Sequence, residues 1–194
     1  PDAGEGDDRV PGPFYDPPGE VVVRDVHKRE IMLRYTHALV SKMEKWPGWV
    51  EKGVVNPTDG YVIAIDGRGC NDFLDGVSPL SIEAFLPFGN LTLRLDRATR
   101  KEVDRYFEYS DTVHKKSQAP VSTAPLLDPA YGPVSAVLHS LVDCGNHPPR
   151  LGGDFTLLHN PIATCPIPDA AFSWCLQQHY REDHLDPIYP DGAE

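Results

Sequence analysis

The sequence predicts an α/β protein in which helices flank a mixed sheet. Three observations support this prediction: one long segment has apolar residues at helical spacing, several short segments have the apolar runs or alternation of strands, and the two kinds of segment alternate along the chain. A chain of 194 residues, 40% of them hydrophobic, can bury one core but is short for two domains. We expect a single domain over residues 1–194, with loosely ordered acidic ends at residues 1–20 and 181–194.

The first predicted element is a helix over residues 26–46. Its apolar side chains recur at steps of three and four residues, which places them on one stripe: Met32, Tyr35, Leu39, Met43 and Trp46. Polar residues such as Arg34 and Lys45 repeat on the opposite face. Pro47 and Gly48 follow, and we expect them to end the helix because proline cannot continue its hydrogen-bond ladder.

Two strand patterns follow this helix. Residues 61–66 form a nearly continuous apolar run between Gly60 and Gly67, which is typical of a strand buried on both faces. Residues 91–95 alternate apolar and polar side chains, and residues 103–109 return after a charged turn. This pair predicts an antiparallel hairpin, and we expect residues 91–95 to belong to the central sheet.

The second half of the chain predicts a loop, two strands and a helix. Residues 114–133 are polar and contain four prolines, so we expect an extended surface loop there. Strands are predicted over residues 134–141 and 155–159, joined by a long connection. Residues 170–180 are predicted to form a closing helix with Asp169 as its N-cap.

The charge balance argues against some functions. With 18 basic and 29 acidic side chains the net charge is −11, so we do not expect nucleic acid to bind over the whole surface. Residues 24–52 hold a local excess of basic side chains that can face phosphates. No apolar stretch reaches the roughly 18 residues of a membrane span, and the four cysteines lack C-x-x-C spacing. We therefore expect a cytoplasmic protein with reduced thiols and no membrane contact; a secreted protein with disulfides is the alternative.

Histidines and cysteines are numerous in the second half, but only one pair has a ligand spacing. Cys175 and His179 stand four residues apart, which on a helix brings two metal ligands together. The other candidate ligands are His139, Cys144, His147, His159, Cys165 and His184. Because no second pair has a recognisable spacing, we expect most of these residues to lie in the core or at strand ends, and whether any of them binds a metal stays open.

The sequence contains no complete catalytic motif. Ser140 lacks the G-x-S-x-G context of an exposed nucleophile, and no glycine-rich phosphate loop is present. Asp66 is the strongest candidate, because α/β sheets place functional groups at the carboxyl ends of strands. Asp96 and Asp154 also lie at predicted strand boundaries, where they can converge with Asp66. The alternative is that Asp66 and Gly67 form the turn that ends the strand.

Seven segments of the chain together resemble a family of uncharacterised bacterial proteins. They are residues 31–42, 52–55, 59–66, 85–89, 127–131, 134–138 and 154–161. That family in turn resembles the C-terminal part of PD-(D/E)XK nuclease-like proteins. The resemblance covers residues 1–183 and implies an incomplete restriction-endonuclease-like core. Met32 and Met43 are the only methionines, so we expect the chain to be part of a longer protein.

The resemblance implies a nuclease-like function on nucleic acid. Residues upstream of Pro1 would contact the nucleic acid and complete a Mg²⁺ site in the longer protein. Arg34 and Lys42 are, with Asp66, the matching site candidates in this chain. Because no acidic residue is followed by a lysine two positions later, we expect the chain itself to hold no cofactor and to lack metal-dependent nuclease activity.

A non-catalytic protein-interaction or accessory module is the alternative function. Aromatic side chains in or beside predicted loops can anchor a protein partner. The candidates are Trp46, Trp49, Phe85, Phe88 and Tyr131. Core packing explains such residues equally well.

Overall fold

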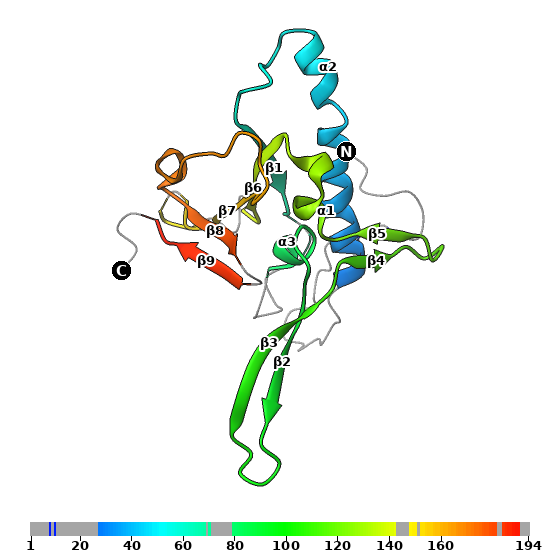
Figure 1. Ribbon diagram of the computed structural model, residues 1–194, viewed down its shortest axis with the longest axis vertical. Coiled ribbons are helices and arrows are strands. Elements are labelled where there is room, and N and C mark those ends of the chain that lie inside the picture. The colour runs from blue at the N-terminus through cyan, green and yellow to red at the C-terminus, as the bar shows by residue number, and fades with distance from the viewer. Residues whose placement is uncertain are drawn as a thin grey trace, which may run out of the picture.

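A five-stranded mixed sheet organises the computed structural model, which describes residues 8, 10, 27–68, 70, 79–142, 148–150, 152–181 and 184–190 (Figure 1). The strand order is β1-β6-β7-β8-β9, and these strands span Tyr61–Asp66, Val134–Ser140, Phe155–His159, Leu176–Arg181 and His184–Ile188. β1 pairs with β6, and β7 with β8, in parallel; the other two pairs are antiparallel. The predicted α/β class with a mixed sheet is confirmed.

Helix α1 (Lys28–Met43) packs its apolar stripe on this sheet. Tyr35 and Leu39 are fully buried in one core cluster with Ile63 of β1 and Val137 of β6. Burying one large apolar side chain stabilises the fold by roughly 1.5–3 kcal/mol, so the stripe holds the helix against the sheet. The predicted stripe is therefore confirmed from Met32 to Met43, whereas Trp46 lies beyond the end of α1.

The end of this helix differs from the prediction. α1 ends at Met43, and a second short helix, α2 (Trp46–Glu51), contains Pro47 and Gly48. Pro47 lies in the first turn of α2, where its missing N–H would have had no helical partner in any case. The expectation that Pro47 and Gly48 stop a helix is wrong, because they help to start one.

Strand β1 is buried on one face rather than two. Ile63 and Ile65 are buried in the cluster that contains α1, whereas Ala64 and Asp66 are exposed. The prediction of burial on both faces is therefore wrong at this end of the strand. The second face of this edge strand carries only the small side chain of Ala64 and the carboxylate of Asp66 there.

The predicted hairpin exists, but it lies outside the sheet. β2 (Phe88–Leu95) and β3 (Glu102–Tyr109) form a two-stranded antiparallel sheet of their own that projects from the rest of the chain (Figure 1). We call residues 88–109 the arm. Lys28 of α1 fastens its base: the ammonium pairs with Glu83 of α3 (Leu80–Glu83) at 2.6 Å and donates to Asn90 at 3.2 Å. The expectation that residues 91–95 belong to the central sheet is wrong.

The segment predicted as one extended loop has more structure than expected. A small hairpin of β4 (Thr112–His114) and β5 (Pro120–Ser122) is followed by two 3-10 turns, η3 (Pro125–Leu127) and η4 (Pro129–Tyr131). Leu126 is fully buried, so this segment contributes to the core as well as to the surface.

Residues 170–180 form no helix. A 3-10 turn, η5 (Asp169–Phe172), leads into β8, which is hydrogen-bonded to β7 on one side and β9 on the other. The apolar spacing fitted a helix, but pairing on both sides satisfies the backbone of β8 as a strand. β9 also gives residues 184–188 a place in the sheet, within the C-terminal segment expected to be loosely ordered. Most of residues 1–20 lie outside the described residues.

No helix in the described part of the chain has the length and apolar character needed to cross a membrane.

Candidate functional site

Asp66 lies where the sequence placed it, at the carboxyl end of β1. Because β1 and β6 are parallel and Asp66 is in register with Ser140, both residues mark the same end of the sheet. The Asp66 carboxylate accepts a hydrogen bond from the backbone N–H of Arg68 at 3.0 Å and pairs with the Arg68 guanidinium at 2.8 Å. These contacts match the alternative interpretation, in which Asp66 takes part in the turn that ends the strand.

A buried pair of polar side chains lies behind this turn. His139 Nε2 and Tyr35 Oη are hydrogen-bonded at 3.1 Å, and burial lowers the pKa of His139 to about 4 despite the opposing charge of Asp66. Gly67 covers the pair: a Cβ at this position would come within 2.5 Å of both bonded atoms. His139 is therefore a neutral core residue that no substrate group can reach through Gly67.

Ser140 is hydrogen-bonded to a carboxylate and not to a histidine. Its Oγ donates to Asp154 Oδ2 at 2.5 Å and accepts from the backbone N–H of Val142 at 3.1 Å. A nucleophilic serine needs an aligned general base, and the neighbouring His139 bonds to Tyr35 instead. The described residues therefore form no serine–histidine pair at this end of the sheet.

Asp154 binds Ser140 at the same end of the sheet as Asp66, but two other candidates lie far from it. Asp96 lies in the turn at the end of the arm, where its carboxylate accepts from Thr99. The carbonyl of Lys42 accepts from Tyr61 Oη at the opposite end of β1, about 16 Å along the strand from Asp66. Arg34 precedes Tyr35 and lies on α1 toward the Asp66 end, half-buried and without an ion pair to any described carboxylate.

The only described group of three metal-type ligands lies elsewhere, on β7, η5 and β8. His179 Nε2 is 3.1 Å from Asp169 Oδ1, and His159 Nε2 is 3.8 Å from the same oxygen. Both histidines were candidates from the sequence, whereas Asp169 was expected to cap a helix and Cys175 to be the partner of His179. A strand separates residues four positions apart by about 13 Å, so β8 removes that pairing.

Hydrogen bonding assigns the proton of His159. Gln177 is almost completely buried, and its Nε2 donates to the carbonyls of Asp169 and Phe172 at 3.0 and 3.3 Å. Its Oε1 is therefore the acceptor for His159 Nε2 at 2.8 Å, which requires a proton on that nitrogen. Burial also lowers the pKa of His159.

The arrangement of the two rings does not suit one shared ion. His159 and His179 are stacked, with centroids 3.9 Å apart and planes inclined by 13°. A metal lies close to the plane of each imidazole that binds it, and one ion cannot lie in two parallel planes. As placed, the cluster of His159, Asp169, Gln177 and His179 is a hydrogen-bonded network that joins β7, η5 and β8.

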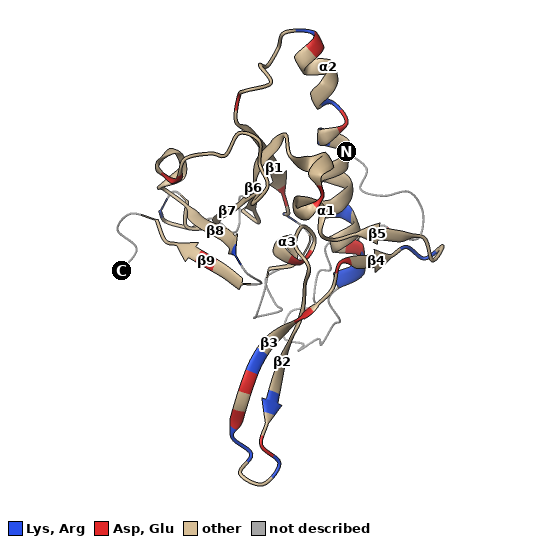
Figure 2. Ribbon diagram, viewed as in Figure 1, with Lys and Arg blue, Asp and Glu red and all other residues tan. Residues whose placement is uncertain are grey.

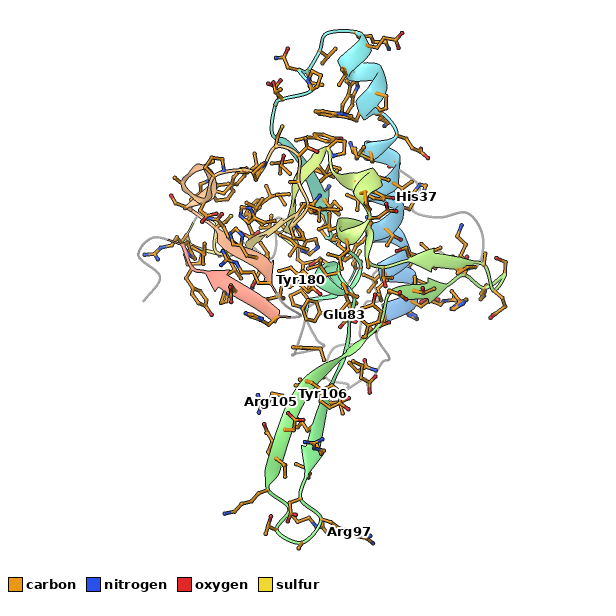
Figure 3. All side chains as sticks on the ribbon, viewed as in Figure 1. His37, Glu83, Arg97, Arg105, Tyr106 and Tyr180 are labelled. Atoms are coloured by element: carbon orange, nitrogen blue, oxygen red, sulfur yellow. The ribbon has the colours of Figure 1, made fainter. Side chains whose placement is uncertain are left out.

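Three exposed cations without described ion pairs lie together at the end of the arm. Arg94 pairs with Asp104 at 3.2 Å and Arg105 with Glu102 at 2.9 Å, so the nearby carboxylates are occupied. The remaining cations, Arg97, Arg100 and Lys101, are exposed and form no ion pair with any described residue. We call these three residues the basic tip (Figure 2), and Arg97 points away from the rest of the chain (Figure 3).

The turn geometry presents the basic tip. Asp96 accepts from the backbone N–H and hydroxyl of Thr99, both at 2.7 Å, and Arg100 has a positive φ of 58°. Charged residues were visible in this turn from the sequence, but a charge count cannot tell which of them are paired. By contrast, two of the basic side chains in the excess over residues 24–52 form ion pairs within the protein. Lys28 pairs with Glu83, and Arg29 pairs with Asp8 and Glu30.

Comparison of the chain with protein-family models, with curated proteins and with solved structures finds no match in any of the three. The resemblance to PD-(D/E)XK nuclease-like proteins therefore stays a prediction.

Proposed function

We propose that this chain binds nucleic acid through the basic tip of its arm. The observation that carries the proposal is the exposure of Arg97, Arg100 and Lys101 together at the end of the arm, without ion pairs to described residues. Phosphates are suitable partners for such a cluster, because neutralising them releases condensed counterions from the nucleic acid.

The length of the arm sets the basic tip apart from the charged residues of the described sheet and helices. β2 has eight residues and is therefore about 26 Å long, whereas charges are screened over about 8 Å at physiological salt. The net charge of −11 opposes a contact over the whole surface, so we propose a local contact, at the tip alone.

The form of the arm suits the same class of ligand. A two-stranded ribbon can enter a groove of a duplex, and exposed aromatic rings stack on the bases of single strands. Tyr106, which is exposed beside the ion-paired Arg94 and Asp104, supplies such a ring (Figure 3).

The proposal keeps the partner implied by the resemblance and places the contact on the chain itself. A restriction-endonuclease-like core, completed by upstream residues that hold Mg²⁺, stays a prediction, as does nuclease activity of a longer protein. We expect the chain alone to cleave neither DNA nor RNA with Mg²⁺ or Mn²⁺. Cleavage that disappears in Asp66→Ala would contradict this expectation.

Two further expectations concern the cellular compartment and the alternative function. The cytoplasmic location stays a prediction, in keeping with the free thiols of Cys165 and Cys175. The protein-interaction module also stays a prediction: of its candidate anchors, Phe85, Phe88 and Trp46 are buried, whereas Trp49 and Tyr131 are half-buried.

Fluorescence anisotropy with labelled single-stranded and duplex DNA tests the proposed function. The triple variant Arg97→Glu/Arg100→Glu/Lys101→Glu is expected to weaken binding at least tenfold at low salt. The slope of log K against log salt should fall by about 2 to 3, because up to three phosphate contacts are lost.

A matched control reverses three exposed lysines, one at the end of α1, one between α1 and α2, and one after α2, in Lys42→Glu/Lys45→Glu/Lys52→Glu. Its change in net charge is the same, so a general electrostatic effect would weaken both variants equally. Binding lost in the control but kept in the tip variant would transfer the contact to the helical excess and overturn the proposal. So would a wild-type chain that binds neither probe.

A further inference from the structure

We propose that the apolar face of the arm packs against the same face of a second copy of this chain, in a two-fold dimer. The proposal goes beyond nucleic-acid binding because it uses a different surface, the side of the arm and not its basic tip.

The register of the hairpin defines this face. Leu91 lies opposite Phe107, Leu93 opposite Arg105, and Leu95 opposite Glu102, and residues directly opposite each other share a face. The pairing shifts by one residue between Arg94 and Leu95, so Val103 is the extra residue of a β-bulge. This bulge places Val103 beside Leu95 and Glu102. The apolar face is therefore formed by Leu91, Leu93, Leu95, Val103 and Phe107.

The outer part of the apolar face is open. Leu93, Leu95 and Val103 are 48%, 53% and 60% exposed. Phe107 packs at the base of the arm, where the centroid of its ring lies 5.3 Å from that of Phe88. An isolated two-stranded ribbon is only marginally stable in water, so covering these three side chains would stabilise it.

The opposite face of the arm has a polar character. Arg94 pairs with Asp104, and Thr92 donates to Glu108 at 2.8 Å. The arm is thus amphipathic along its length: its polar face is suited to contact with water, and its apolar face is suited to contact with another apolar surface.

The charges on the apolar face favour a second copy as the occupant. The only charged side chains there are Arg105 and Glu102, which hold each other through two hydrogen bonds of 3.0 and 2.9 Å. A two-fold axis that crosses the arm between them brings Arg105 of one copy opposite Glu102 of the other. Leu93, Leu95 and Val103 then surround the axis. In such an isologous contact the second copy supplies both the apolar strip and the complementary charges.

Light scattering on the full chain at about 100 µM, well above a micromolar dissociation constant, tests the dimer. Wild type is expected to be a dimer, and Leu93→Lys/Leu95→Lys a monomer. The matched control Thr92→Lys/Tyr106→Lys adds the same charge to the polar face and should remain a dimer. A monomeric wild type, or a dimer that survives the leucine substitutions, would overturn the proposal.

A charge exchange separates lost contact from lost folding. Arg105→Glu alone and Glu102→Arg alone oppose like charges across the axis, so each variant is expected to dimerise at least tenfold more weakly. Mixed in equal amounts, they place Glu opposite Arg at both contacts and should recover the dimer. Failure of the mixture to recover it would contradict the two-fold arrangement, while DNA binding by the basic tip is measured independently.

Discussion

The neutral imidazole of His139 links the stability of the protein to pH. Burial lowers its pKa from 6.5 to about 4, so between these values the unfolded chain binds more protons than the folded chain. The stabilisation is complete above the unfolded pKa and is lost as the pH falls toward the folded one. Gly67 enforces this burial by lying directly on the bond between His139 and Tyr35.

We expect the free energy of unfolding to fall by up to about 3 kcal/mol as the pH is lowered through this window, from the size of the pKa change. Urea unfolding of wild type and His139→Gln, above and within the window, measures the effect. In the variant, the free energy of unfolding should depend less steeply on pH. Some dependence should remain because burial also lowers the pKa of His159. An unchanged pH dependence in the variant would show that His139 is not the titrating group.

At the scale of one element, β8 carries two adjacent glutamines in opposite situations. Gln177 is 1% exposed and makes three side-chain hydrogen bonds, to His159, Asp169 and Phe172. The Oε1 atom of Gln178 is buried and has no hydrogen-bond partner among the described residues. The same substitution at the two positions therefore compares a satisfied buried amide with an unsatisfied one.

Gln177→Met is expected to lower the free energy of unfolding by about 2 to 4 kcal/mol, because it leaves a histidine N–H and two carbonyls without partners. Gln178→Met should be neutral or stabilise by up to about 1 kcal/mol, because it removes a buried oxygen that has no partner. Urea unfolding measures both. Equal effects at the two positions would contradict the network described around Gln177.

The arm is also an element whose contribution can be separated from the sheet. Its outer residues 93–105 contribute nothing to the main core cluster, which reaches the arm only at Phe88. The base of the arm is therefore held by the core, and the outer part presents the two surfaces that we propose for binding, the basic tip and the apolar face.

For the whole molecule, we expect that the arm can be shortened without unfolding the sheet. Thr92 and Tyr106 are directly opposite each other, so replacing residues 93–105 with Asn-Gly leaves a standard two-residue hairpin. The midpoint of thermal unfolding should change by about 4 °C or less. The shortened chain should bind no DNA and should not dimerise. A large loss of thermal stability would show that the outer arm supports the fold.

Local patterns in the sequence were sufficient for the elements whose burial follows their own periodicity. The stripe containing Tyr35 and Leu39 predicted α1, and the apolar runs predicted β1, β6 and β7 within about one residue. These patterns work because a helix or strand that packs one face on a core must repeat its apolar residues at its own period. The position of Asp66 at a strand end followed in the same way.

Long-range pairing decided the rest. Residues 170–180 fit the helical period, yet β7 and β9 bind this segment from both sides as β8, and the resulting burial of Gln177 organises His159, Asp169 and His179. Likewise, alternation in residues 91–95 predicted a strand but not that it would leave the sheet. Local periodicity and composition were therefore enough to identify the periodic elements and the charges of the arm. Which strands pair and which charges are neutralised depend on residues far apart in the chain, so these features became visible only in the folded structure.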